Sequence, residues 1–175
     1  MSGAWRDTVQ LSELNRGAVR LHLEADEPYR RGLSKRLDLP EIISLVADVE
    51  VRAWLDGAEI EGHFRAQVRQ ICGITLEPFE QPLEGSFEIR VAPAGSPHAI
   101  EETEAGGEIT LDLEAPDPPD ILQGDAIDVG GYLAEAIALE VDPFPRKPGA
   151  TFDYEPPPAE DSPFAVLKKL ERPKE

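Results

Sequence analysis

The alternation of apolar and polar residues across residues 47–91 constrains the fold of this chain more than any other sequence feature. It occurs in three consecutive segments, and Asp56-Gly57, a pair typical of a two-residue hairpin turn, separates the first two. Segments with this period have one apolar and one polar face, so they predict an antiparallel sheet with one face in water. The apolar positions are Ala47, Val49, Val51, Ala53 and Leu55, then Ile60, Phe64, Ala66, Val68 and Cys72, then Leu83, Phe87, Ile89 and Val91.

Two further segments have the spacing of amphipathic helices, which would cover the apolar face of that sheet. In residues 27–39 the apolar residues recur at four-residue steps, and Pro28 suits a first helical turn. In residues 128–141 Asp128 is a good N-cap, and Pro143 disfavours helix at the residue before it. Residues 40–45 would add a short helical turn. We therefore predict an α+β fold, an antiparallel sheet of four or more strands packed with two or three helices.

The remaining segments predict one domain followed by a tail. Ile109, Leu111 and Leu113 could form a further strand, and residues 93–107 are acidic and turn-rich, as in a mobile loop. A proline-rich linker then leads to Ser162-Pro163, which would start a short helix. We expect a single domain over residues 1–156 and a C-terminal tail with a short helix over residues 157–175.

The charge is strongly negative and unevenly distributed. Asp and Glu total 35 against 17 Lys and Arg, for a formal net charge of −18. Residues 91–145 contain no Lys or Arg, yet thirteen acidic residues lie between Glu101 and Asp142. Such a field repels nucleic acid phosphates and attracts basic proteins. We find no apolar run long enough for a membrane span and no secretory signal, and we expect a cytoplasmic protein.

The residue types that carry catalysis or bind metals are scarce. Three histidines, His22, His63 and His98, are scattered without metal-ligand spacing. Cys72 is the single cysteine, and its place on an apolar face predicts a small buried residue rather than a reactive thiol. No nucleophile elbow or phosphate-binding glycine loop is present. We therefore predict no enzyme activity, no metal and no cofactor; a hydrolase would need a polar-lined pocket that the sequence does not reveal.

Three groups of charged residues are candidates for partner binding. Arg65 and Arg69 lie on the polar face of the second predicted strand, where pairing with cross-strand glutamates is an equally good interpretation. Arg146-Lys147 lies in a stiff segment rich in proline, which lowers the entropy cost of docking; a structural strap over the sheet edge is the alternative. The acidic candidates are Glu101, Glu102 and Glu104.

Four blocks, spread over most of the chain, together resemble one protein family. They are LSKRLDL at residues 33–39, QICGITLEPF at residues 70–79, GDAIDVGGYLAEAIALEVDPFPRKPGA at residues 124–150 and SPFAVLKKL at residues 162–170. With them the chain resembles the YceD family, the large ribosomal RNA subunit accumulation proteins. Many relatives carry Cys-x-x-Cys where this chain has Cys72 and Thr75, so the resemblance transfers no zinc or redox role to that pair.

The resemblance implies a non-catalytic accessory factor that helps the RNA of the large ribosomal subunit accumulate. Two mechanisms stay open. The protein could bind a basic ribosomal protein and shield its charge, or bind rRNA or a pre-ribosomal large subunit directly through Arg65, Arg69, Arg146 and Lys147. The net charge favours the first, because RNA phosphates would have to approach a polyanion. Neither mechanism involves a membrane or a small-molecule substrate.

Overall fold

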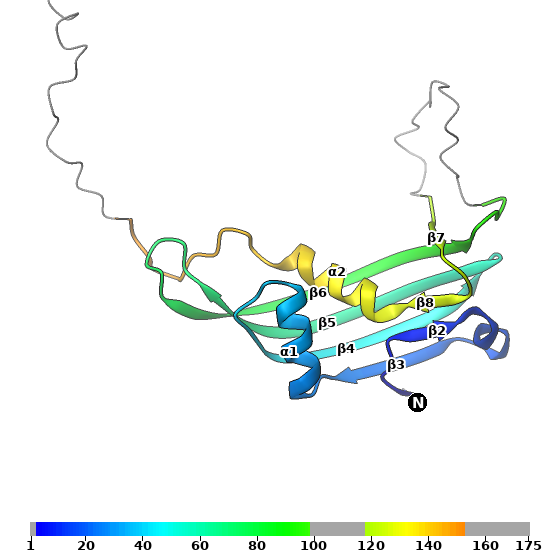
Figure 1. Ribbon diagram of the computed structural model, residues 1–175, viewed down its shortest axis with the longest axis horizontal. Helices are drawn as coiled ribbons and strands as arrows, with labels where there is room; N and C mark the ends of the chain where they lie inside the picture. Colours follow the sequence, from blue (N-terminus) through cyan, green and yellow to red (C-terminus); the bar gives the residue numbers. More distant parts are fainter. Residues whose placement is uncertain (1–2, 99–117, 153–175) are drawn as a thin grey trace, which may run out of the picture.

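A computed structural model describes residues 3–98 and 118–152 (Figure 1). Strands and helices follow one another along the chain in this order: β1 (Gly3–Ala4), β2 (Thr8–Gln10), the 3-10 helix η1 (Leu11–Arg16), β3 (Val19–Glu24), α1 (Glu27–Arg36), β4 (Glu41–Trp54), β5 (Gly57–Ile71), β6 (Pro78–Pro93), β7 (Asp120–Leu122), β8 (Ala126–Asp128) and α2 (Val129–Glu140). The predicted strand at residues 109–113, most of the predicted mobile loop and the predicted tail helix lie outside the described residues.

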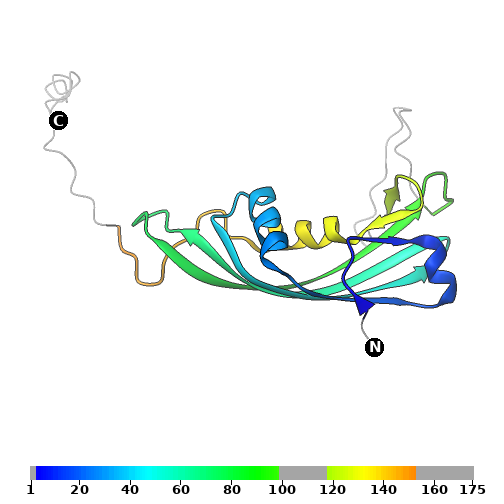
Figure 2. The same cartoon turned by 60° about the horizontal axis from the view of Figure 1, so that its bottom comes forward.

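Six strands form the main sheet, in the order β1-β3-β4-β5-β6-β7. Strands β3 to β6 are an antiparallel meander, whereas the short edge strands β1 and β7 run parallel to their neighbours β3 and β6. Strands β2 and β8 form a separate antiparallel pair. Figure 2 shows both α-helices on one face of the curved sheet. No helix of the described residues covers the other face, which we call the open face. The predicted α+β fold with an antiparallel sheet of four or more strands is confirmed, although the sheet is mixed at its edges.

The helices bury most of the apolar stripes that their spacing predicts, although Ala138 in the predicted stripe of α2 is exposed. Asp128 caps α2 by accepting a hydrogen bond from the Gly131 N–H, and Leu133 and Ile137 are fully buried against the sheet. Asp26 caps α1 in the same way, and Leu33 is its central buried residue. Helix α1 ends at Arg36, earlier than predicted, because the backbone turns left-handed at Asp38, with φ of 53°.

The predicted helical turn at residues 40–45 is wrong, because residues 41–45 begin β4. Ile42 and Leu45 are both buried, and their three-residue spacing resembles a helix. A β-bulge between Ile42 and Ser44 causes this spacing, since the extra residue changes which positions face inward. The core residues Ala47, Val49 and Val51 then follow with regular strand alternation.

The β4–β5 hairpin turns one residue earlier than predicted. Trp54 pairs with Gly57, so the two turn residues are Leu55 and Asp56. Leu55 adopts φ of 51° and is exposed, although its position in the alternation predicts burial. Gly57 belongs to β5 instead, where a Cβ atom would lie 1.9 Å from the Val91 carbonyl oxygen. The strand packing, and not the turn, therefore requires this glycine.

Candidate functional site

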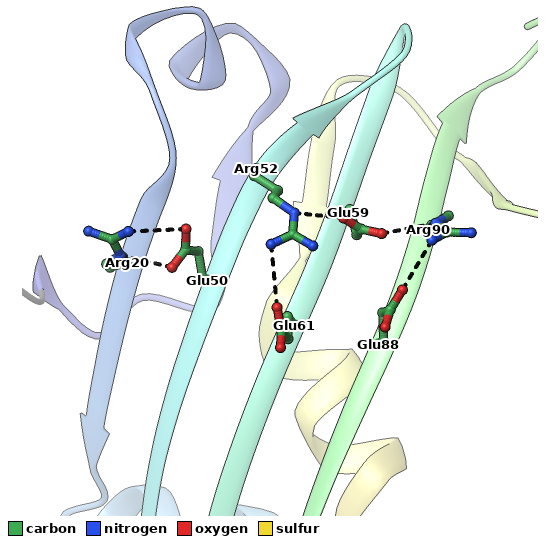
Figure 3. A network of polar contacts seen from close by, with 7 residues as sticks. All are labelled: Arg20, Glu50, Arg52, Glu59, Glu61, Glu88 and Arg90. Carbon is green, nitrogen blue, oxygen red and sulfur yellow. Dashed lines mark hydrogen bonds and ion pairs between the residues drawn. The ribbon is translucent and has the colours of Figure 1, made fainter.

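The open face of the sheet carries a network of ion pairs across four strands (Figure 3). Arg20 pairs with Glu50, while Arg52 contacts Glu59 at 2.6 Å and Glu61 at 3.4 Å. Arg90 bridges Glu59 and Glu88, at 3.0 Å and 3.1 Å. Positive and negative side chains thus alternate across the strands. Within the described residues, this part of the open face offers carboxylates already matched to arginines.

Arg65 and Arg69 lie on the same open face of β5, as their spacing predicts, but in different surroundings. Arg69 pairs with Glu41 and, at 3.4 Å, with Glu80. Arg65 lies opposite Glu84 in the β5–β6 register and makes no ion pair within residues 3–98 and 118–152. Arg52 faces Glu59 across the β4–β5 pair and does not extend a basic surface toward Arg65.

Glu59 is the buried centre of this network. It is 7% exposed, and it accepts hydrogen bonds from Arg52 at 2.6 Å and from Arg90 at 3.0 Å. The bond from Arg52, reinforced by Arg90, holds the pKa of Glu59 below its usual value although burial raises it. Because the pKa is lowered in the folded state, this stabilisation is present above pH 4.5 and is lost as the pH falls further.

We expect Glu59→Gln to lower the free energy of unfolding by about 2 kcal/mol, because it weakens hydrogen bonds from two charged donors. Glu61→Gln is the matched control on the same strand, since Glu61 is half exposed and contacts Arg52 only at 3.4 Å. Exposed pairs contribute little, so the control should cost less than about 0.5 kcal/mol. Urea denaturation at neutral pH measures both. Equal losses in the two variants would contradict a special role for the buried carboxylate.

A second cluster lies at the end of the sheet where β5 joins β6. We call residues 72–77 the hairpin loop and residues 142–150 the strap. The Gly73 N–H donates to the Pro145 carbonyl at 2.9 Å, and the Gln70 side chain donates to the Asp142 carbonyl at 3.1 Å. Lys147 forms an ion pair with Glu77 at 2.8 Å. Figure 1 shows the strap running back from α2 to this tip of the sheet.

The strap places its two basic side chains differently. Lys147 is occupied by Glu77, whereas Arg146 is exposed and makes no ion pair with any other described residue. Of these two residues, Lys147 therefore makes a structural contact, and Arg146 presents an accessible charge. Among the described residues, Lys147 and Arg69 pair with different glutamates, so these basic side chains share no ion-pair partner.

The sulfur atom of Cys72 accepts hydrogen bonds from both the hairpin loop and the strap. Its side chain is buried, as predicted, and three backbone N–H groups, of Ile74, Thr75 and Lys147, each donate to Sγ at 3.4 Å. The Thr75 side chain and these N–H groups lower the pKa of the Cys72 thiol to about 6. Cys72 is thus a hydrogen-bond acceptor as well as a small core residue.

The lowered pKa of Cys72 predicts a pH-dependent stability. A pKa that is lower in the folded state favours folding above the unfolded value of 9.0, and that contribution is lost as pH falls through about 6. The free energy of unfolding should therefore rise between these two pH values. We expect Cys72→Ser, which retains an acceptor but does not titrate there, to lack this rise. Urea denaturation of both proteins across the interval measures the difference. Parallel pH profiles would contradict a thiolate at this position.

A third site is an acidic groove between β7, β8 and α2. Its volume is 560 Å³, and its lining includes Asp120, Asp128, Tyr132 and Glu135 but no Lys or Arg. Burial, followed by the nearby carboxylates with Asp120 first, raises the pKa of Tyr132 above its usual range. The sequence indicates the acidic character of this region, but not the groove, because β7 has no alternation long enough to predict. The candidates Glu101, Glu102 and Glu104 lie outside the described residues.

Groups that would hold a metal or perform nucleophilic catalysis are not assembled in the part of the chain that the structure describes. No group of three His, Cys, Asp or Glu side chains there could hold a metal ion. The Nδ1 atom of His22 lies 2.7 Å from Asp48, and His63 is exposed on the open face, as predicted. No described helix is long and apolar enough to cross a membrane.

Comparison with known proteins identifies a family. The family model of the large ribosomal RNA subunit accumulation protein YceD matches residues 60–171, more than half of the chain. The match begins within β5 and includes the hairpin loop, α2 and the strap; of the four blocks of resemblance, only residues 33–39 fall outside it. No curated protein and no solved structure shows a significant match. The chain belongs to the YceD family of large ribosomal RNA subunit accumulation proteins.

Proposed function

We propose that this protein is a non-catalytic, cytoplasmic accessory factor in the accumulation of large-subunit rRNA, and that it acts by binding a basic ribosomal protein. The family supplies the link to large-subunit rRNA. The proposed partner follows from the charge of the molecule, and the proposed absence of catalysis from the lack of catalytic motifs in the sequence. Among residues 3–98 and 118–152, no serine or cysteine side chain is hydrogen-bonded to a histidine ring.

The observation that carries the proposal is a difference, among the described residues, between the basic and the acidic side chains: many of the basic ones are already held in ion pairs, whereas a group of the acidic ones is not. On the open face and the strap, Arg20, Arg52, Arg69, Arg90 and Lys147 are already paired with glutamates. The carboxylates that line the groove beside α2 have no Lys or Arg among them. A negative field of this kind attracts a basic protein and accelerates its association.

Direct binding of rRNA is the competing mechanism. It would use Arg65, Arg69, Arg146 and Lys147, of which Arg69 and Lys147 are held in ion pairs. Phosphate binding there would have to displace glutamates, in a molecule whose net charge is −18. These two costs make a basic protein the better-supported partner.

A salt titration of binding tests the proposal. The purified full chain is mixed separately with a basic large-subunit ribosomal protein and with fragments of large-subunit rRNA, and affinity is measured across a salt series. We expect affinity for the protein that declines with salt, and no comparable affinity for RNA at physiological salt. Tight RNA binding without protein binding would overturn the proposal.

A further inference from the structure

Among residues 3–98 and 118–152, one long strand edge of the sheet has no partner along most of its length. Strand β6 spans Pro78–Pro93, but β7 pairs with it only at Val91, Ala92 and Pro93 (Figure 1). On its other side β6 pairs with β5 without a break in register, from Ile71 opposite Pro78 to Ala58 opposite Val91. Within the described residues, the part of β6 before Val91 therefore borders a strand on one side only.

The register determines which backbone groups point toward this open edge. Just beyond the last pair, the Cys72 N–H donates to the Glu77 carbonyl at 2.9 Å. Hydrogen-bonded pairs alternate in an antiparallel ladder, so the odd-numbered residues of β6 bond to β5. The N–H and C=O groups of Glu84, Ser86 and Glu88 then point away from β5. Pro78 and Pro82 share this parity, as expected for prolines confined to the free edge of a strand.

Acidic side chains recur along the open edge. Glu80, Glu84 and Glu88 occupy every second position of its outer face, with Pro82 and Ser86 between them, and all three are exposed. Glu84 makes no ion pair with another described residue, while Arg90, the one cation of β6, is held by Glu59 and Glu88. The edge ends in a hollow of 330 Å³ whose lining includes Asp120.

We propose that an extended basic segment of a partner protein adds as a strand to the β6 edge at Glu84–Glu88, between Pro82 and β7. Its backbone would bond to the free N–H and C=O groups, and alternate Lys or Arg side chains would lie beside the glutamates. This proposal rests on the proposed function and names the surface that the basic partner uses.

Charge also argues against a second copy of this chain at the same edge. Antiparallel pairing of two β6 strands centred on Glu84 would place Glu84 opposite its own counterpart and Glu80 opposite Glu88. Centring on Ser86 would place Glu84 opposite Glu88. Like charges directly opposite each other destabilise a strand pair. Opposite charges would stabilise the pairing of a basic strand at the same positions where like charges would destabilise the pairing of a second copy.

The test uses the full chain and a short synthetic peptide in which lysine and valine alternate. Its control is a peptide of the same composition in which all the lysines precede the valines. We expect the alternating peptide to bind more tightly and to protect the amides of Glu84, Ser86 and Glu88 from hydrogen exchange. Protection of these amides in the free protein would mean that the edge is already occupied, and would overturn the proposal.

Two substitutions at Ser86 separate backbone bonding from charge. Ser86→Pro removes the outward N–H, in a position of the kind that Pro82 already tolerates, and should weaken binding about tenfold. Ser86→Ala keeps the N–H and should leave the affinity unchanged. Equal affinities of the two variants, or no gain in protection in the unmodified chain, would overturn the edge site while leaving the acid-driven binding of a basic protein intact. Absence of any binding to a basic ribosomal protein would instead overturn the proposed function.

Discussion

Replacing Gly57 with alanine is expected to lower the free energy of unfolding by about 3 kcal/mol. A Cβ atom at this position would lie 1.9 Å from the Val91 carbonyl oxygen and 2.9 Å from Ala92 Cα. Both atoms belong to the backbone of β6, so no side-chain rotation can relieve the overlap. The strands must move apart where Ala58 and Val91, both fully buried, pair in the core.

Gly32→Ala is the matched control, because it adds the same methyl group where space exists. Nothing lies within 4 Å of a Cβ at Gly32, which is in the middle of α1. Alanine should therefore stabilise the helix, by about 0.5–1 kcal/mol. Urea denaturation of both variants and the unmodified chain gives the comparison. If Gly57→Ala leaves stability unchanged, β5 and β6 do not approach each other as described.

Much of the sheet could be predicted because successive side chains of a strand point to opposite faces, so the alternation in the sequence matches the alternation in burial. In β5 and β6 every predicted inward residue from Ile60 to Val91 faces the core side, and both strands run in regular register. Prediction failed where an extra residue interrupts that period. The bulge between Ile42 and Ser44 makes a strand look helical, and the approach of Val91 moves Gly57 from the turn into the strand.

Strand β3 was not predicted, although its sequence carries a signal. Leu21 and Leu23 are buried, while Arg20, His22 and Glu24 between and beside them are exposed, which is the alternation of a short strand. Strands β1 and β7 have no such signal. Each contains at most three residues, and their pairing depends on neighbours that are distant in sequence, β3 for one and β6 for the other.

The candidate site shows the same division between local pattern and tertiary contact. The segregation of charge, with no Lys or Arg in residues 91–145, is visible in the sequence. Whether each basic residue forms an ion pair is not visible in the sequence, because it depends on strand register and on contacts between distant segments. Arg69 meets Glu41 and Glu80 from the two neighbouring strands, and Lys147 meets Glu77 across 70 residues of chain. Cys72 likewise gains the hydrogen bond from the Lys147 N–H only because the strap returns to the hairpin loop.

The acidic residues between Glu101 and Asp125 are expected to control the rate of association with the basic partner. Neutralising five carboxylates, Glu101, Glu102, Glu104, Asp120 and Asp125, should slow association about tenfold at low salt and flatten its dependence on salt. Asp128 is left unchanged because it caps α2. The control is Glu24→Gln with Asp38→Asn, which removes negative charge at exposed positions of other elements. Stopped-flow mixing with a basic large-subunit ribosomal protein measures the rates.

Substitution of Arg146 and Lys147 by glutamine separates the two mechanisms. If the acidic residues attract a basic protein, this variant should bind that protein with nearly the affinity of the unmodified chain. The substitution removes the exposed ion pair between Lys147 and Glu77, and such pairs contribute little. If the protein instead binds rRNA, the loss of two phosphate contacts should reduce the salt slope of RNA binding by about 2, while the acidic substitutions should leave RNA binding unchanged or strengthen it. Because the same substitutions act in opposite directions under the two mechanisms, measuring both variants against both partners decides between them. Protein binding that survives loss of the five carboxylates, together with tight RNA binding that requires Arg146, would establish direct RNA binding.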